Sequence, residues 1–350
     1  MESDVKKDIF KRLAQAAIKT GVEMSPHIIV EVLYNKIFDH KTISDPIKRF
    51  EDDDFPLLMK EKAKFKSGDN LLTGYFYNYK KYRSDKIIIF AHGYGNGHHR
   101  YLEIIDYLAK NGFYVFSYDC TSFDESEGDG IKGFPQGVID LDNAITYVKR
   151  TRKYKDKDII LVGHSWGAYC VSAIINKYPH ISKVVAMAGF NYAIDLVAEH
   201  GIQWAGKLIE DQIPFMHEYE KRHFGEYADY TVIKAVKKST TQFFFIHSED
   251  DETVPIQIGL KKYKKEFKKD PRIKYKVFKD RTHICYNTVE GNKYFAALKG
   301  EYEKHLKPLE DKILTFDEKL HLLNLIVDKK KYLNMLNIPL MEEIVKFIQA

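Results

Sequence analysis

The sequence predicts an α/β protein built on a largely parallel sheet with helices on both faces. Short, mostly apolar runs rich in Val, Ile and Phe are typical of strands that are buried on both sides. Helical stretches separate most of these runs, as the crossovers between parallel strands require. The runs are 86–93, 113–119, 158–165, 183–189, 242–251 and 273–280, and the helical stretches are 99–110, 137–151, 167–178 and 256–268.

A hairpin precedes the parallel part. Residues 63–79 read AKFKSGDNLLTGYFYNY, in which two short alternating runs flank Ser67, Gly68, Asp69 and Asn70. Alternation on both sides of a Gly-Asp-Asn turn favours two antiparallel strands.

Composition limits the classes of function. The chain has 350 residues, of which 44% are hydrophobic, and 55 Lys and Arg against 50 Asp and Glu give a net charge of +5. The basic runs are short and interrupted, so we expect no nucleic-acid partner. Three scattered cysteines favour neither a disulfide framework nor a zinc site and fit a reducing compartment. Without a signal-peptide pattern or an apolar span of membrane length, the chain is predicted to be cytoplasmic.

The expected organisation is a core with three helical additions. The segments are an N-terminal helical extension (1–62), a first core part (63–189), a helical cap insertion (190–231), a second core part (232–305) and a C-terminal helical tail (306–350). Residues 5–38 are predicted to form a basic amphipathic helix, which either packs on the body or lies on a membrane. The insertion contains several aromatic residues and is either a cap on the carboxyl edge of the sheet or a long crossover packed elsewhere.

Polar residues close the apolar runs, and their positions indicate a site. Ligands bind beyond the carboxyl ends of parallel strands. A Ser, an acidic cluster and a His follow three of the runs in that order, at Ser165, at 249–251 and at His283. Their strands should bring them to one edge of the sheet.

Ser165 stands in GHSWG, between a predicted strand and a predicted helix. A sharp turn there requires small residues two before and two after the serine, which Gly163 and Gly167 provide. The turn would lift the hydroxyl out of the sheet and set backbone N–H groups at a helix start.

A serine hydroxyl needs a base to become a nucleophile, and His283 is the candidate because it follows the last predicted strand. The histidine in turn needs a carboxylate on its other nitrogen. Asp251 is favoured because it stands four residues before Pro255, and Asp250 is the alternative, with a helix-capping role if it is not the partner.

Together, HGYG (92–95), GHSWG (163–167), HSEDDETVP (247–255) and DRTH (280–283) resemble the α/β-hydrolase superfamily over residues 63 to about 303. The resemblance is to its branch of serine esterases, monoacylglycerol lipase-like enzymes and serine aminopeptidase-like enzymes. It implies an α/β-hydrolase fold, to which the residue pattern adds a helical cap insertion and extra N- and C-terminal helices.

The resemblance also implies roles for individual residues. Ser165 would be the nucleophile, Asp251 the acid and His283 the base. The backbone N–H groups of Tyr94 and Trp166 would form the oxyanion hole, while His92, Gly93, Gly163 and Gly167 would shape the loop and the elbow. One departure is the loop DCTSFDESEG (119–128), where Ser122 and Asp124 stand at positions usually occupied by glycine.

The predicted function is hydrolysis of carboxylic esters with small to medium acyl groups through an acyl-enzyme, with a small-molecule ester as the partner. Alternatives are an amidase, aminopeptidase or lipase of the same fold, and a catalytically silent ligand-binding protein. Neither a metal nor an organic cofactor is expected, since the serine mechanism requires none. The adjacent pair His98 and His99 diverges on a helix and has no suitably spaced carboxylate, so it does not indicate a metal site. The pattern favours no particular oligomeric state.

Overall fold

The computed structural model describes residues 25–80, 84–205 and 207–350. Of the predicted N-terminal helix, residues 5–24 lie outside the described residues, and the rest forms α2 (Pro26–Phe38). Among the described residues, no helix is both long enough and apolar enough to span a bilayer.

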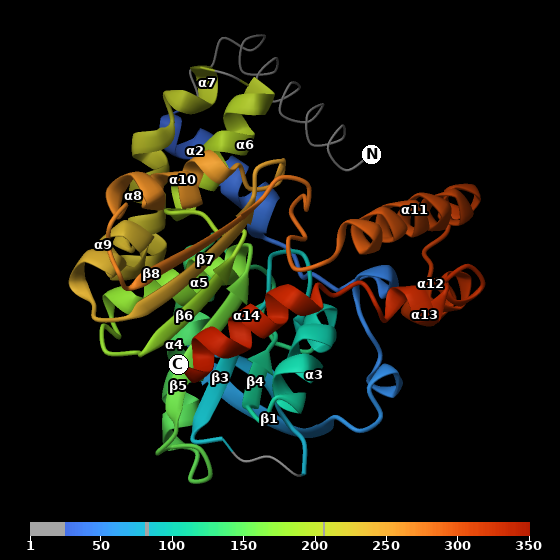
Figure 1. The fold of residues 1–350 in the computed structure, drawn as a ribbon. Coiled ribbons are helices and arrows are strands. Elements are labelled where there is room, and N and C mark those ends of the chain that lie inside the picture. The colour runs from blue at the N-terminus through green and yellow to red at the C-terminus, as the bar shows by residue number, and fades with distance from the viewer. Residues whose placement is uncertain (1–24, 81–83, 206) are drawn as a thin grey trace.

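One eight-stranded sheet forms the centre of the protein (Figure 1), as the sequence predicted. Its strands are β1 (Met59–Ser67), β2 (Asn70–Asn78), β3 (Lys86–Ala91), β4 (Tyr114–Tyr118), β5 (Asp158–His164), β6 (Lys183–Met187), β7 (Gln242–Ser248) and β8 (Ile273–Phe278). Their spatial order is β1-β2-β4-β3-β5-β6-β7-β8. The predicted hairpin β1–β2 is antiparallel, β2 pairs antiparallel with β4, and all other pairs are parallel.

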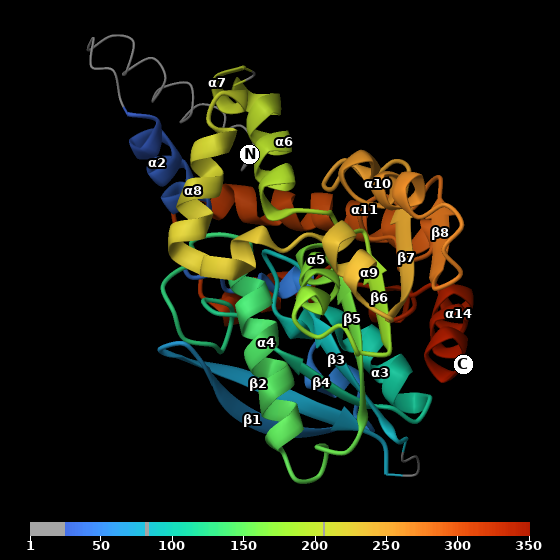
Figure 2. The ribbon, with the colours of Figure 1, turned by 90° about the vertical axis from the view of Figure 1, so that its left-hand side faces the viewer.

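Helices cover both faces of the sheet (Figure 2). Side chains on each strand alternate between two hydrophobic layers, so both faces are apolar and both need to be covered. On β3, Ile87 and Ile89 enter one layer while Ile88 and Phe90 enter the other. The first layer contains α4 (Pro135–Arg150), α5 (Trp166–Ala173), α9 (Val232–Lys238) and α10 (Leu260–Glu266), and the second contains α3 (Leu102–Lys110) and α14 (Ile338–Gln349).

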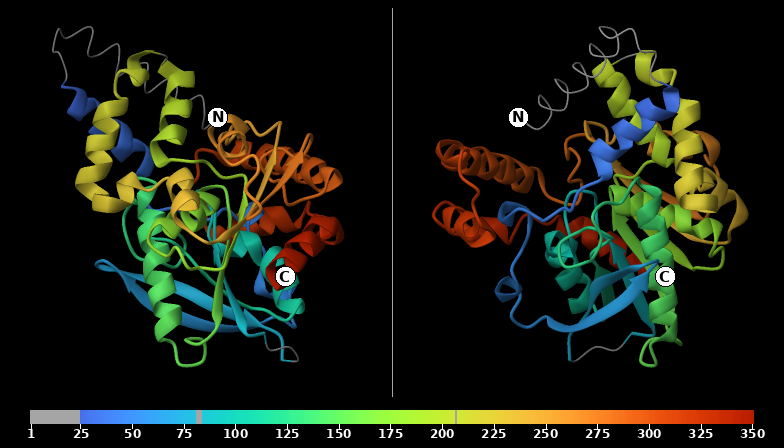
Figure 3. Two further views of the ribbon diagram at one scale, coloured as in Figure 1. Left: turned by 60° about the vertical axis from the view of Figure 1, so that its left-hand side comes forward. Right: turned by 180° about the vertical axis from the view of Figure 1, so that it is seen from behind.

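The predicted insertion at 190–231 contains α6 (Ala193–Ala205), α7 (Lys207–Glu210) and α8 (Ile213–Phe224). These helices stand above the carboxyl edge of the sheet together with α2 (Figure 3). Helix α2 packs on α8, where the rings of Tyr34 and Tyr219 lie 4.4 Å apart.

The C-terminal helices lie in two different regions of the molecule. Helices α11 (Val289–Leu306), α12 (Phe316–Asn324) and α13 (Lys329–Tyr332) project from the body on the side away from the cap helices (Figure 1). The last helix, α14, returns to the sheet and buries Leu340, Met341, Ile344 and Ile348 in its second layer. The last helix of the segment treated as a tail in the sequence is therefore part of the core.

Candidate active site

Ser165 occupies a tight turn between β5 and α5. Its backbone is in an unusual conformation, φ 57° and ψ −121°, which is strained for a residue with a side chain. A Cβ on Gly163 would lie 2.4 Å from the Gly167 carbonyl oxygen, and a Cβ on Gly167 would lie 2.1 Å from that of Ala91. Only glycine fits at either position, so the two glycines permit the turn that presents the hydroxyl.

The structure brings Ser165, His283 and Asp251 together. The Ser165 Oγ lies 2.9 Å from His283 Nε2, and His283 Nδ1 lies 2.9 Å and 3.1 Å from the two Asp251 oxygens. A carboxylate only accepts hydrogen bonds, so Nδ1 carries a proton and donates a hydrogen bond to Asp251. In the neutral imidazole, Nε2 is then free to accept the serine proton.

Asp251 is held ionised by several donors. Its Oδ1 accepts from the backbone N–H of Thr253 (3.0 Å) and of Val254 (2.8 Å), and its Oδ2 lies 3.1 Å from His247 Nε2. Burial by itself raises the pKa of this carboxyl, but the hydrogen bonds from His247 and His283 outweigh burial and hold the pKa well below its usual range. His247 escaped the sequence analysis, although its position four residues before Asp251 was a usable signal.

Asp250 faces a different part of the site. Its Oδ1 accepts from the Thr282 backbone N–H at 2.9 Å and from the Ser248 hydroxyl. It therefore fastens the loop that carries His283 to the end of β7, without touching the imidazole. Asn292 holds the same loop from α11, donating to the carbonyls of Arg281 and Ile284.

His164 and Tyr101 form a hydrogen-bonded pair next to the site, which the sequence did not indicate. His164 Nε2 lies 2.9 Å from the His283 carbonyl, so this nitrogen donates. Its Nδ1 lies 3.0 Å from the Tyr101 hydroxyl, which also accepts from the Gly93 backbone N–H at 3.0 Å. Burial lowers the pKa of His164 to about 3, so its ring is neutral. Its Nδ1 therefore accepts the hydrogen bond that the Tyr101 hydroxyl donates.

The residues predicted to form an oxyanion hole flank Ser165. Trp166 is the first residue of α5, where a backbone N–H has no acceptor within the helix. Tyr94 follows β3 and Gly93. The backbone of Gly93 passes close to Ser165, since a Cβ added to this glycine would lie 3.2 Å from Ser165 Cβ. His92 shapes this loop from below, since its Nε2 accepts from the Cys120 backbone N–H at 2.9 Å and its Nδ1 donates to the Gly93 carbonyl at 2.9 Å.

Ser122 and Asp124 hold the N-terminal extension at the site. Both have positive φ, 70° and 36°, the region that glycine adopts most easily. The Ser122 hydroxyl donates to the His40 carbonyl at 2.9 Å, and Asp124 accepts from the N–H and hydroxyl of Ser44. Side chains that glycine lacks therefore attach residues 40–44 to this loop.

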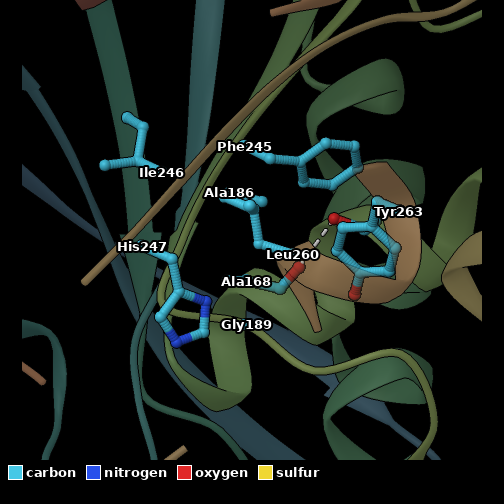
Figure 4. Close-up of a pocket in the computed structure, with 9 residues that line it drawn as sticks. Ala168, Ala186, Gly189, Phe245, Ile246, His247, Leu260 and Tyr263 are labelled. Atoms are coloured by element: carbon cyan, nitrogen blue, oxygen red, sulfur yellow. Dashed lines mark hydrogen bonds between the residues drawn. The ribbon is translucent and has the colours of Figure 1, made fainter. Parts of the chain in front are cut away.

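A cleft of about 1670 Å³ opens around Ser165 and His283. One end is lined by apolar residues of α2 and α6, namely Leu33, Ile37, Phe38, Leu196 and Val197. Its other end runs along α11 and the segment after it. A separate void of about 10 Å³ beneath α5, lined by Ala168, Phe245, His247 and Tyr263 (Figure 4), has room for no more than about one water molecule.

No group of three or more His, Cys, Asp or Glu side chains suited to a metal ion occurs in the described part of the chain. His98 is committed to other partners, with Nδ1 2.8 Å from Asp119 and Nε2 2.9 Å from the Tyr77 hydroxyl. Cys285, close to His283 in sequence, is fully buried, and burial raises the pKa of its thiol.

Comparison with known proteins found one family match and several similar folds. Residues 82–224 match a family described as serine aminopeptidase, S33. An esterase from Pyrococcus furiosus superposes with a TM-score of 0.54 at 20% identity, covering 76% of this chain and 98% of the esterase. The chain therefore has the α/β-hydrolase fold. An acylaminoacyl peptidase from Pyrococcus horikoshii shares this fold, with a TM-score of 0.50 at 16% identity over 65% of this chain and 38% of the peptidase. No protein of curated function matches the sequence.

Proposed function

We propose that this α/β-hydrolase is a serine hydrolase that cleaves carboxylic esters of small to medium acyl groups through an acyl-enzyme. The observation that carries the proposal is the continuous hydrogen-bonded chain from Ser165 Oγ through His283 to Asp251, with distances of 2.9 Å at both links. Such a chain has the geometry required to activate a serine hydroxyl.

In the first half of the reaction, Ser165 Oγ attacks the ester carbonyl carbon while His283 Nε2 takes the hydroxyl proton. Asp251 stabilises the imidazolium that results and keeps Nδ1 as the donor. The backbone N–H groups of Tyr94 and Trp166 hold the oxyanion of the tetrahedral intermediate. His283 then protonates the leaving alcohol, and the acyl group stays on Ser165.

In the second half, water attacks the acyl-enzyme carbonyl while His283 accepts a proton from it. The second tetrahedral intermediate collapses, His283 returns the proton to Ser165 Oγ, and the carboxylic acid leaves. Neither half requires a metal ion or an organic cofactor.

The cap end of the cleft supports an acyl group as the part of the substrate bound there. Leu33, Ile37, Leu196 and Val197 offer hydrocarbon surface and carry no charge. We therefore propose that residues 190–231 act as a cap whose inner face, together with α2, sets the acyl length.

An aminopeptidase or amidase is the second candidate, because the matched family is described as serine aminopeptidase and a similar fold occurs in an acylaminoacyl peptidase. Ester and amide cleavage use the same acyl-enzyme, so the catalytic residues do not separate them. We also retain a reducing, cytoplasmic location as a proposal, supported by Cys120, Cys170 and Cys285, which are all unpaired and buried.

The deciding experiment combines a probe with a substrate series. A fluorophosphonate should label Ser165 in the native protein and should leave Ser165→Ala unlabelled. p-Nitrophenyl esters from acetyl to palmitoyl should show an optimum at short to medium length that Ser165→Ala abolishes. Full turnover by Ser165→Ala would refute a serine mechanism, and faster turnover of aminoacyl-naphthylamides than of esters would favour the peptidase.

A further inference from the structure

Arg100 is a buried cation inside the cleft that contains Ser165. It lies in the turn before α3, lines the cleft, and only 6% of its surface is exposed. Its terminal nitrogen Nη1 is buried and has no hydrogen-bond partner among the described residues. A guanidinium has five N–H donors, and leaving one of them without an acceptor in a buried position is costly.

No carboxylate of the described residues forms an ion pair with Arg100. Its neighbours are the Phe295 ring, whose centroid lies 4.4 Å from the guanidinium carbon, and the hydroxyl-bearing side chains of Tyr101, Tyr286 and Tyr332. The nearby Glu103 uses Oε1 to accept from the Leu336 backbone N–H at 2.8 Å. Burial also raises the pKa of Glu103 to about 7, which reduces its negative charge near neutral pH.

Buried charges in proteins are normally compensated by a partner. Arg100 opens onto a cleft, so a ligand can supply the missing negative charge. Guanidinium groups bind carboxylate and phosphate oxygens strongly because both form charge-assisted hydrogen bonds.

The end of the cleft near α11 is basic. The charged residues that line the whole cleft are Lys48, Arg100, Lys299, Lys304, Lys307, Lys312 and Lys319 against Asp45, Glu252, Glu303 and Glu310. Lys307 and Lys312 form no ion pair with any described residue. An excess of positive charge in a cleft attracts anionic ligands and raises their rate of association.

The position of Arg100 relative to His283 determines which part of the substrate it meets. His283 protonates the leaving group, so the leaving group departs past this histidine. The chain after His283 runs through Tyr286 into α11, whose Phe295 packs on Arg100. The apolar cap residues lie at the other end of the cleft, since the cap helices and α11 stand on opposite sides of the molecule (Figure 1).

We propose that Arg100 binds an anionic oxygen group, a carboxylate or a phosphate, on the leaving alcohol of the substrate. The substrate class is then an ester that joins an apolar acyl group to a negatively charged alcohol. This inference rests on the proposed ester hydrolysis and names its substrate class.

The test uses three butyrate esters that differ only in the leaving phenol: 3-carboxyphenyl, 3-phosphonophenyl and the neutral 3-carbamoylphenyl. For the native enzyme, we expect kcat/KM to be higher by about tenfold or more for at least one anionic ester than for the neutral one. Arg100→Gln should remove that preference. Comparing the ratio between variants cancels the intrinsic reactivity of each ester. The better anionic ester identifies the group as carboxylate or phosphate.

Arg152→Gln is the matched control, because Arg152 is exposed and precedes β5 at the opposite edge of the sheet. It should keep the native ratio. Arg100→Lys preserves the charge without the planar fork, so its ratio should fall between those of the native enzyme and Arg100→Gln. This variant keeps the test available if Arg100→Gln does not fold.

A binding measurement separates this inference from the proposed function. By calorimetry, Ser165→Ala should bind 3-hydroxybenzoate or 3-hydroxyphenylphosphonate about tenfold more tightly than 3-hydroxybenzamide, and adding Arg100→Gln should abolish the difference. Equal binding of all three, or a preference that survives without Arg100, would overturn the inference. A preference for anionic acyl groups in hemisuccinate esters, with none for anionic phenols, would also overturn it. Absence of turnover of every ester would instead overturn the proposed function.

Discussion

Asp124 accepts two hydrogen bonds from Ser44, one from the backbone N–H at 2.6 Å and one from the hydroxyl at 2.8 Å. The Ser44 hydroxyl in turn accepts from the Gly97 backbone N–H at 2.8 Å. Ser44 thus connects the N-terminal extension to two loops at the carboxyl edge of the sheet. Because α2 lines the apolar end of the cleft just before this point, the connection helps to set the shape of the cleft.

We predict that Asp124→Ala loosens the N-terminal extension. The substitution removes both acceptors of Ser44, and it leaves a side chain at a positive φ of 36°. The free energy of unfolding should fall by about 1–3 kcal/mol, and limited proteolysis between residues 38 and 50 should become faster. Asp129→Ala, at an exposed position of the same segment, should change neither measurement. Unaltered protease resistance in Asp124→Ala would show that other contacts hold the extension.

The two neighbouring acids should differ sharply in their effect on turnover. An amide at position 251 can donate to His283 Nδ1 and reverse the tautomer, which prevents Nε2 from accepting the serine proton. Asp251→Asn should therefore lower kcat by about 10⁴-fold. Asp250→Asn keeps an oxygen for the Thr282 N–H and the Ser248 hydroxyl, so kcat should fall by less than about tenfold. The reverse ranking in steady-state kinetics would reassign the carboxylate.

Tyr101→Phe should impair catalysis without touching any of the three residues of the chain from Ser165 to Asp251. It removes the acceptor of the Gly93 N–H and the donor to His164 Nδ1, and both groups stay buried. We expect a decrease of about 1–3 kcal/mol in the free energy of unfolding. A drop of about tenfold in kcat should accompany it, because the Tyr94 N–H shifts away from the oxyanion. Tyr79→Phe, which loses a hydrogen bond to Asp106 at the far edge of the sheet, should lower stability but preserve kcat.

Glu220 should make stability depend on pH. This residue of α8 is fully buried, and its Oε1 accepts from the Tyr34 hydroxyl at 3.0 Å. Its Oε2 finds no hydrogen-bond partner in the described part of the chain. Burial raises the pKa of Glu220 from 4.5 to about 8. The folded protein therefore keeps a proton that the unfolded chain loses above about pH 4.5. Its contribution to stability is complete below that pH and is lost as pH rises through 8.

The free energy of unfolding should accordingly decrease by up to about 1.4 kcal/mol per pH unit between pH 5 and 8 from this residue. Glu220→Gln carries no titrating proton and should remove that slope. Urea unfolding of both proteins at pH 5.5, 6.5 and 7.5 measures it. Identical slopes would mean that Glu220 is ionised in the folded state.

The sequence was informative wherever a short segment sets its own geometry. The alternation of buried strands and helices predicted the sheet, because strands covered on both faces must be apolar throughout. The positions of Gly163 and Gly167 indicated the turn at Ser165, because a Cβ at either would collide with backbone. Neither inference needed information about distant parts of the chain.

Other features depend on contacts between residues far apart in sequence. The pairing of His164 with Tyr101 spans 63 positions, and the GHSWG motif that contains this histidine does not indicate its partner. Helix α14 packs on the sheet although α11, α12 and α13, which precede it in the chain, project away from the body. The sequence of the last helix does not indicate this return. Arg100 follows two histidines in an ordinary stretch, and only the fold shows that it is buried and forms no ion pair with a carboxylate of residues 25–80, 84–205 or 207–350.

The sequence by itself determined the sheet, the order of the motifs along it and the tight turn that holds Ser165, since these follow from periodicity and from the steric demands of a turn. Tertiary structure decided that Asp251 and not Asp250 reaches His283, and that Ser122 and Asp124 fasten the N-terminal extension. It also gave the cleft an apolar end and a basic end. These outcomes depend on the direction of side chains across the packed layers, which no single segment specifies.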